Sequence, residues 1–540
     1  MRTTTRFVVA ALATSTALVL AGCADAQPAG SGESTATVVD GGSLAFAIGN
    51  DPISLNPSGT GSGNDTLYVT RQLVDSLLYQ NPGTGRLEPW LATEWSSNDD
   101  ATVFTFTLRD DVTFSDGTPL TATDVKGTFD DIVAAGASAQ NAAALLIGYD
   151  ETVAVDEHTV EVRFSTPNAA FPNSTATVAL GIVGAATLET PFDERADGRA
   201  IVGSGPFTLG EYTKDVETVL AARDDYAWAP EALGNDGAAH LDEVVFQVVP
   251  EASVRTGSLT SEQVDVIGGV QPNDVQTIDD AGFPLVYRGN PGATFGVYFN
   301  ESRPAVADLD VRKAIAAAID PEVVRDTALN DLFAVATSSL AKTTPGFADE
   351  GDAFAYDPEA AADLLDEAGW TEGADGTRSK DGQPLSLKLA WITNFGPNQT
   401  SLELIQQQLK EVGVEVELVG GSVPEFLKIQ ESGDFDLSWQ NLSRADGDVL
   451  RTTYSTAASN RLHLDDPELE ALLQEQAALA DPDARDEKLA EAQARIAEQV
   501  HQVPVHELTS ILGTLPTVHG VSLGADSRLD SLVGAWEEAE

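Results

Sequence analysis

The most constraining part of the sequence is the segment from residue 95 to 132, where two kinds of hydrophobic spacing follow one another. Phe104, Phe106 and Leu108 alternate with threonines, which is the period-two pattern of a strand with one buried face. Apolar residues resume at 112–114 after a charged break, so we expect a second strand there. The segment therefore begins as β-structure.

A turn and a capped helix follow these strands. Residues 115–118 read Ser-Asp-Gly-Thr, a composition typical of turns. Thr121 and Asp124 have the spacing of a capping box, in which two side chains satisfy backbone amides at the start of a helix. The helix then presents apolar residues at helical spacing, namely Val125, Phe129 and Ile132. This pattern predicts a structure but no function.

Length and charge exclude some classes of protein. A chain of 540 residues is too long for one ordinary core, so we expect two or three domains. The chain carries 85 acidic and 30 basic side chains, a formal net charge of −55. Nucleic acid would be repelled by such a surface, and few basic groups exist to displace its counterions. The charge suits a protein that works outside the cell.

The N-terminus has the pattern of a lipoprotein leader. Residues 1–23 contain two arginines, a short apolar run and small residues before Cys23, the single cysteine of the chain. This arrangement is typical of a signal peptide rather than a stable transmembrane span. The sequence Leu-Ala-Gly-Cys resembles the bacterial lipoprotein box, which implies that Cys23 is lipidated. Residues 24–40 are small and polar, as in a flexible tether.

The segment from 95 to 132 also resembles the solute-binding lipoproteins of peptide and nickel ABC importers, the dipeptide- and oligopeptide-binding family. The residues that carry this resemblance are Trp95, Phe106, Leu108, Arg109, Phe114, Asp116, Gly117, Pro119, Leu120, Thr121, Ala122, Asp124, Val125 and Phe129. Residues 203–206 resemble the Gly-x-Gly-Pro strand of that family, and residues 311–320 and 356–370 resemble two of its helices. The agreement extends over nearly all of the chain after the leader.

Local signals predict further elements. Asp357 and Pro358 are typical of the first residues of a helix that Gly369 ends. Apolar spacing predicts a helix from residue 66 to 78. Residues 385–418 alternate strand, helix and strand, which indicates a partly parallel sheet.

The resemblance implies an α/β fold of two lobes joined by a hinge, like type II periplasmic binding proteins of the large cluster with an extra domain. Lobe I is expected to comprise residues 41–80, 201–290 and 510–540, with 81–200 as its extra subdomain. Lobe II is expected to span residues 291–509. The chain would cross between the lobes near residues 290 and 509.

Enzyme and metal chemistry find little support in the sequence. His501 and His506 are five residues apart, but Pro504 lies between them and breaks any helix that would align them. Residues 202–206 lack the Gly-x-Ser-x-Gly spacing of a nucleophile elbow. Because the chain has so many carboxylates, pairs of them occur by chance, and no glycosidase pair can be identified. We expect no catalytic residue, no metal ligand and no cofactor.

Binding is the remaining function, and the candidate contacts are aromatic, amide and charged groups at the ends of loops. The candidates are Gly61, Ser62, Tyr68, Phe295, Tyr298, Trp391, Asn394, Phe395, Trp439, Asn441, Arg444 and Asp446. In peptide-binding relatives an aspartate in the segment that corresponds to residues 435–453 pairs with the α-amino group of the ligand. Asp446 and Asp448 are candidates for that role, although another alignment places Ser443 or Arg444 there.

The sequence thus indicates a monomeric substrate-binding lipoprotein, anchored by lipid outside the cytoplasmic membrane, which captures a short peptide and delivers it to an ABC permease. A chelated metal such as a nickel complex is the alternative ligand. Alternatives of another class are a secreted hydrolase and a ligand-sensing module.

Overall fold

The largest sheet has seven strands, in the order β12-β21-β11-β1-β10-β9-β8. Its strands are β1 (Ser43–Ile48), β8 (Phe207–Thr213), β9 (Glu217–Ala222), β10 (Glu243–Val248), β11 (Val266–Ile267), β12 (Leu285–Gly289) and β21 (Thr509–Thr514). These bounds come from a computed structural model that describes residues 37–59, 63–457 and 460–538. The leader with Cys23, most of the tether, and the candidates Gly61 and Ser62 lie outside the described residues.

A four-stranded antiparallel sheet contains the segment that dominates the sequence. Its order is β4 (Ala92–Ser97), β5 (Val103–Leu108), β7 (Thr159–Phe164) and β6 (Tyr149–Ala154). Phe104, Phe106 and Leu108 are buried on one face of β5, as the alternation predicts. The capping box is also confirmed: it opens α2 (Ala122–Ala135), and the Thr121 backbone amide donates to Asp124 at 2.9 Å.

Two local predictions were wrong. Residues 112–114 form no second strand but a single antiparallel bridge between Thr113 and Pro119, because a proline cannot donate to a ladder. The helix expected from 66 to 78 ends early, as α1 (Asn64–Thr70). The reason lies just beyond this end: the carbonyls of Gln72 and Leu73 accept hydrogen bonds from the amides of Phe207 and Gly205, so they are unavailable to a helix.

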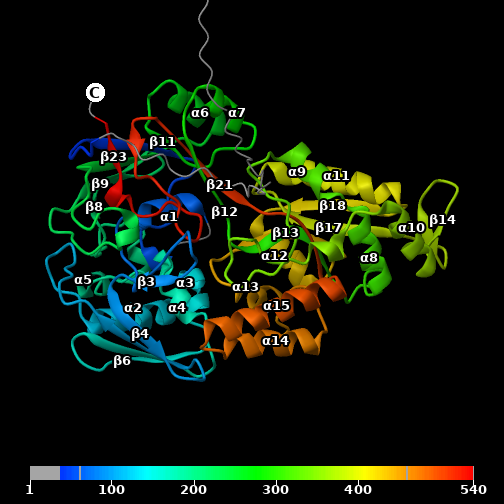
Figure 1. Ribbon diagram of the computed structural model, residues 1–540, viewed down its shortest axis with the longest axis horizontal. Helices are drawn as coiled ribbons and strands as arrows, with labels where there is room; N and C mark the ends of the chain where they lie inside the picture. Colours follow the sequence, from blue (N-terminus) through cyan, green and yellow to red (C-terminus); the bar gives the residue numbers. More distant parts are fainter. Residues whose placement is uncertain (1–36, 60–62, 458–459, 539–540) are drawn as a thin grey trace, which may run out of the picture. The chain divides into compact units, whose positions relative to one another are not determined.

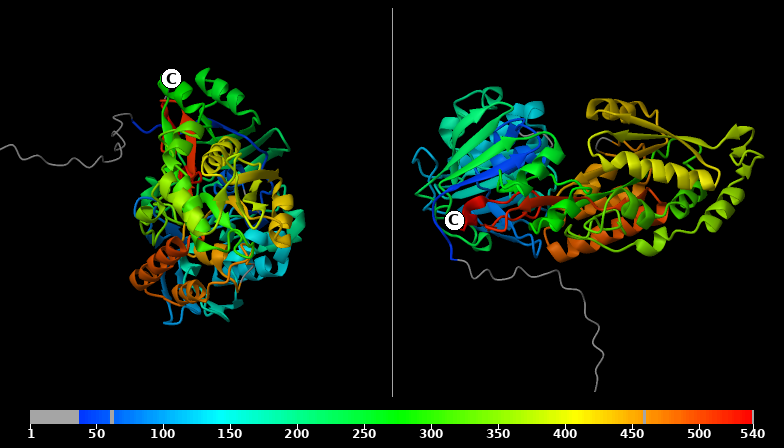
Figure 2. Two further views of the ribbon diagram at one scale, coloured as in Figure 1. Left: turned by 90° about the vertical axis from the view of Figure 1, so that its right-hand side faces the viewer. Right: turned by 90° about the horizontal axis from the view of Figure 1, so that it is seen from above.

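A five-stranded sheet organises the second half of the chain. Its order is β18 (Glu415–Gly421), β17 (Ser386–Ile392), β19 (Leu437–Ser443), β13 (Gly292–Phe299) and β20 (Gln502–His506). β17 pairs in parallel with both β18 and β19, as the strand-helix-strand pattern predicts. Figure 2 shows the connecting helices α11 (Pro397–Glu411) and α12 (Val423–Ser432) on opposite faces of this sheet.

Further helices flank the sheets. They are α3 (Gln140–Leu145), α4 (Phe171–Ser174), α5 (Ala185–Leu188), α6 (Ala252–Thr260), α7 (Val275–Asp280), α8 (Leu309–Ala318), α9 (Pro321–Ala328), α10 (Pro358–Glu367), α13 (Val449–Tyr454), α14 (Pro467–Ala477) and α15 (Pro482–Gln499). The predicted cap of α10 is confirmed, since the Asp357 carboxylate accepts from the Ala360 amide. The minor strands are β2 (Leu78–Gln80), β3 (Leu87–Pro89), β14 (Thr371–Glu372), β15 (Arg378–Lys380), β16 (Gln383–Pro384), β22 (Val518–His519) and β23 (Trp536–Glu537).

The chain passes between the two larger sheets twice. It leaves the seven-stranded sheet at the end of β12 and enters the five-stranded sheet at β13, then returns from β20 to β21 (Figure 1). Each sheet has its own hydrophobic core. We call the part built on the seven- and four-stranded sheets the first lobe, and the part built on the five-stranded sheet the second lobe.

Along the part of the chain that the structure describes, no helix combines the length and the apolar character that a bilayer crossing requires.

The Gly-x-Gly-Pro motif of the first lobe serves close packing. The Gly205 amide donates to the carbonyl oxygen of Leu73 at 3.1 Å. A Cβ atom on Gly203 would lie 2.0 Å from that same oxygen. The motif therefore lets one backbone segment lie directly against another.

Replacing Gly203 by alanine should destabilise the protein by about 1–3 kcal/mol or more, because the added methyl group collides with a backbone oxygen that cannot rotate away. The midpoint of chemical denaturation measures this loss. The matched control is Gly257→Ala in α6, where a Cβ meets nothing within 4 Å and helix propensity predicts a gain of about 0.5–1 kcal/mol. Equal midpoints for the two variants would contradict the packing role.

Candidate functional site

Two adjoining pockets lie where the loop after β19 meets the first lobe. The first, the Arg528 pocket, is lined by Leu67, Arg71, Tyr79, Gln80, Trp90, Ala176, Thr177, Val178, Ala445, Gly524, Ala525, Asp526, Arg528, Leu529 and Asp530. The second, the Arg444 pocket, is lined by Ala144, Leu145, Ile147, Asn168, Ala170, Asn173, Ser174, Thr177, Arg444, Ala445, Asp446, Asp448 and Arg451. Their volumes are about 490 and 430 Å³ with the open mouths included, of which the centre of a water molecule can reach about 40 and 30 Å³.

Both lobes contribute walls to these pockets. Ala445, from the second lobe, and Thr177, from the first, line both of them. The Gln80 side chain donates to the Ala445 carbonyl oxygen at 2.9 Å. The amide of Ala169, which lies between the wall residues Asn168 and Ala170, donates to the Ala477 carbonyl oxygen at 2.8 Å. A solute in either pocket would therefore touch both lobes at once.

The charges of the Arg528 pocket are largely balanced within it. Arg71 stacks 5.1 Å from the centre of the Trp90 ring and donates to the Ala176 carbonyl oxygen. The Tyr79 hydroxyl donates to Asp530 at 2.9 Å, and burial raises the pKa of that carboxyl. Arg528 donates to the backbone of Asp526, while its buried Nε has no partner among the described residues.

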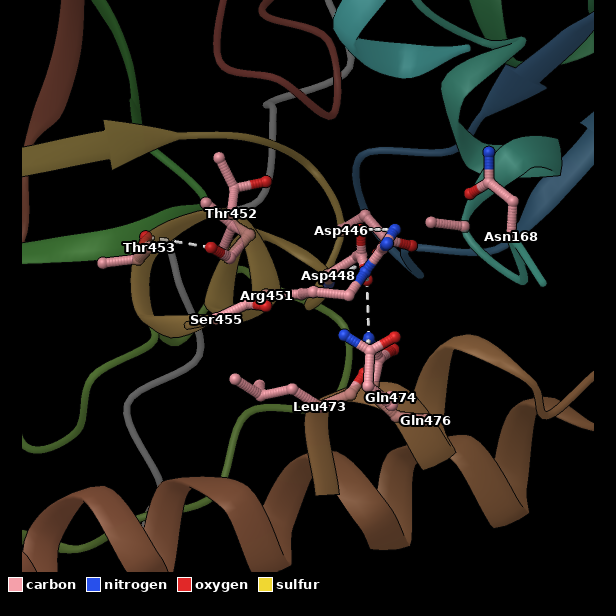
Figure 3. A network of polar contacts seen from close by, with 12 residues as sticks. Asn168, Asp446, Asp448, Arg451, Thr452, Thr453, Ser455, Leu473, Gln474 and Gln476 are labelled. Carbon is pink, nitrogen blue, oxygen red and sulfur yellow. Dashed lines mark hydrogen bonds and ion pairs between the residues drawn. The ribbon is translucent and has the colours of Figure 1, made fainter. Parts of the chain in front are cut away.

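The Arg444 pocket is backed by two buried ion pairs. The Asp446 carboxylate accepts hydrogen bonds from both terminal nitrogens of Arg485, one of them at 2.9 Å. It also accepts one from the Asp448 amide at 2.7 Å. Asp448 in turn receives Nε and a terminal nitrogen of Arg451, each at 2.8 Å. Figure 3 shows Arg451 and Gln476 converging on Asp448.

These pairs keep the Asp448 carboxylate and the Arg485 guanidinium ionised despite burial. Burial raises the pKa of the Asp448 carboxyl, but the hydrogen bonds and charge of Arg451 outweigh it and hold that pKa below its usual value. Burial lowers the pKa of Arg485, but the charge of Asp446 and its hydrogen bonds raise that pKa above its usual value. Gln476 accepts from Arg485 and donates to Asp448, so it links the two pairs.

Four rings form an aromatic cluster near the crossings between the lobes, namely Phe295, Phe395, Trp439 and His506. Phe295 stacks on Phe395 and Trp439, with ring centres 6.0 and 5.5 Å apart. The Trp439 indole donates to the Asn398 side chain at 2.9 Å. Phe395 is half-buried and packs against the cores of both lobes. Three of the predicted contact residues thus meet at one place.

His506 joins this cluster as a neutral ring. Its centre lies 4.8 Å from that of Phe295, and its side chain is fully buried. Burial lowers its pKa to about 4, against a weak opposing contact with the Glu507 carbonyl oxygen. His506 is therefore uncharged at neutral pH.

Two predicted contacts are core residues. Tyr68 is 1% exposed and packs against Phe46, and Tyr298 is fully buried with its hydroxyl donating to the Thr294 carbonyl oxygen. Neither ring offers surface to a solute in this structure, because the sequence pattern marks aromatic residues without distinguishing core from cleft. Asp446, a third candidate, is 4% exposed and paired internally.

The remaining candidates have different surroundings. Trp391 is nearly buried, and its ring lies against Gly420, where a Cβ would come within 2.9 Å. Asn394 is exposed in the turn after β17, and Asn441 is half-buried in β19. Arg444 lines its pocket and donates to the Thr452 hydroxyl at 2.8 Å.

Sequence reasoning missed the first-lobe walls of both pockets. Arg71, Gln80 and Asn173 belong to segments that carry no motif of their own, and Arg528 follows them by more than 350 positions. One usable signal is the rarity of basic residues: because acidic residues far outnumber them, an arginine in this chain is a candidate for a specific role. In the described residues no group of histidine, cysteine, aspartate or glutamate side chains is suited to hold a metal ion.

A family model described as "Bacterial extracellular solute-binding proteins, family 5 Middle" matches residues 86–461. The chain belongs to this family. It is 26% identical over 491 residues to the periplasmic murein peptide-binding protein MppA of Escherichia coli K12, covering 86% of this chain and 88% of that protein. It is 24% identical to a dipeptide-binding protein of Pseudomonas aeruginosa, covering 90% and 93% respectively.

The solved structures agree on the fold. The chain is similar to NikA from Brucella suis in complex with Fe(III)-EDTA, with a TM-score of 0.78, 23% identity, and coverage of 92% of this chain and 100% of that one. The fold is therefore the two-lobed α/β fold of periplasmic binding proteins, as the family resemblance implies. The matched relatives are solute-binding proteins rather than enzymes.

Within this family member, the Asp446 pair should act as a structural element. Replacing Asp446 by alanine leaves the buried Arg485 without its carboxylate, and this should cost about 3–5 kcal/mol of stability in the absence of any ligand. Chemical denaturation of the full-length protein measures the loss.

The control for this variant is Asp434→Ala, which removes the partner of Lys388 from an exposed pair in the same lobe. Its stability should change by less than about 1 kcal/mol. If Asp446→Ala were as stable as this control, the pair would not be structural.

Proposed function

We propose that this protein is the extracytoplasmic receptor of an ABC importer, which captures a short peptide and passes it unchanged to a membrane permease. Membership of the solute-binding family supports the transport role. The observation that carries the proposal is that both pockets are walled by residues from both lobes, next to a double crossing of the chain.

This geometry explains how binding would be signalled. A solute that touches both lobes makes more contacts when the lobes are closed, so it shifts the population towards the closed form. The two crossings restrict the relative motion of the lobes to bending at a few residues, as in hinge closure. A permease that docks on the closed form would then receive only loaded protein.

A short peptide is the favoured ligand because both sequence relatives reported above are named for peptides. The pockets also present apolar surface together with a few amide, hydroxyl and guanidinium groups, the composition expected for a small amphiphilic ligand. Fixed charges in the walls would orient it.

We further propose that the protein acts as a monomer tethered to the outer face of the cytoplasmic membrane by lipid on Cys23. The leader and the lipoprotein-box sequence support this anchor, and the polar tether that follows would give the lobes reach.

Solute capture predicts selective retention of peptides. When a defined mixture of two- to five-residue peptides is incubated with the full-length protein and then removed by filtration, mass spectrometry should find a subset retained at micromolar affinity or better and with unchanged masses. Small-angle scattering should show a smaller radius of gyration with that subset. Cleaved peptides would indicate a hydrolase instead, and no retention together with unchanged scattering would refute peptide capture.

Lipid anchoring predicts that Cys23→Ser abolishes incorporation of labelled palmitate and releases the protein from the membrane fraction. Ser15→Ala, a small change within the leader, should leave both readouts unchanged. Membrane retention of the Cys23→Ser protein at the level of this control would disprove the anchor.

A further inference from the structure

Two arginines and two aspartates line the Arg444 pocket, and a third arginine, Arg485, lies behind it. Arg444, Arg451 and Arg485 stand beside Asp446 and Asp448. Each aspartate is occupied by a two-point contact with one arginine, Asp446 by Arg485 and Asp448 by Arg451. Arg444 is the group left over.

Arg444 has spare hydrogen-bonding capacity. Among the described residues its side chain makes one hydrogen bond, to the neutral Thr452 hydroxyl, and no ion pair within 4.0 Å. A guanidinium group carries five N–H donors, so most of them lack a protein acceptor here. Arg444 is half-buried, and the partial loss of water around it lowers its pKa.

The facing wall supplies no competing carboxylate. The first-lobe residues that line this pocket are apolar, amide or hydroxyl residues, including Asn168 and Asn173. Figure 3 shows Asn168 on the segment that faces the paired aspartates. Asp446 and Asp448 are the acidic residues of the lining, and both are neutralised by their arginines.

The charge of the whole chain makes this arginine without an ion pair informative. With a formal net charge of −55, the protein repels anions at long range. Screening confines that repulsion to about 8 Å at physiological salt, so a local cation decides what enters the pocket. A planar guanidinium can hold a carboxylate or phosphate through two parallel hydrogen bonds.

We propose that Arg444 receives an anionic group of the captured solute, a carboxylate or a phosphate, and that Asp446 does not receive an ammonium group. The proposal deepens the proposed function and rests on it. For a peptide ligand the anionic group is the terminal carboxylate or an acidic side chain. Recognition of a free amino terminus by Asp446, which the family resemblance implied, would require breaking its contacts with Arg485.

The test compares peptides without acidic side chains as free acids, as C-terminal amides and as N-acetylated acids, by calorimetry on the full-length protein. For the wild type, amidation should weaken binding at least tenfold, whereas acetylation should weaken it less than threefold. Arg444→Gln should weaken binding of the free acids at least tenfold and abolish the difference between acids and amides. Amides that bind as well as acids, or acetylation that costs more than amidation, would overturn the proposal.

Matched variants separate the role of Arg444 from general charge and folding effects. Arg461→Gln removes the same charge from an exposed position of the second lobe and should bind like the wild type. Arg444→Lys keeps the positive charge but lacks the planar guanidinium. Its affinity for the free acids should lie between those of the wild type and Arg444→Gln. It also replaces Arg444→Gln if circular dichroism shows that the latter is unfolded.

If no peptide binds, peptide capture is refuted but the anion site is not. A second experiment with small anions therefore tests the anion site by itself. Succinate and inorganic phosphate are titrated against the same variants at constant ionic strength. Saturable binding by the wild type and by Arg461→Gln, but not by Arg444→Gln, supports the anion site, and the anion that saturates identifies carboxylate or phosphate chemistry. Equal binding by all variants, or no binding to the wild type, overturns it.

Discussion

The hydrogen bonding between the two chain crossings is the constraint on which the two-lobed structure depends. β12 and β21 pair through five consecutive residues of each strand. The Asn290 amide then donates to the Leu508 carbonyl oxygen at 2.6 Å, and the Ser510 hydroxyl donates to the Asn290 side chain. Beyond this point β13 pairs with β20 in the other sheet. Because both crossings are tied together, the lobes are held in register while the linking residues can still bend.

An acidic chain needs its few arginines at particular places. Several of them are buried and satisfied by carbonyl oxygens or carboxylates, such as Arg255 in the first lobe and Arg312 in the second. Such groups are retained only where several hydrogen bonds replace water. An arginine that lines a pocket and lacks these partners, as Arg444 does, therefore differs from the others in its chemistry and not only in its position.

Elements whose signals are local were predictable from the sequence. Thr121 and Asp124 are three residues apart, so the box they form is visible in the chain itself. The end of α1 was not, because it depends on amides at residues 205 and 207 that meet the carbonyls of Gln72 and Leu73 only after folding. Local spacing carries no information about such contacts.

The same distinction applies to the site. The aromatic cluster was partly predictable, because Phe295, Phe395 and Trp439 were already candidate contacts as aromatic residues suited to a cleft. The pairing of Asp446 with Arg485 spans 39 positions and joins a loop to a helix, so sequence alone left both Asp446 and Arg444 open as ligand contacts. In the folded chain both oxygens of the Asp446 carboxylate accept hydrogen bonds from Arg485, whereas Arg444 makes one hydrogen bond, to a hydroxyl group. The proposal that Arg444 binds the solute therefore rests on a contrast that only the folded chain displays.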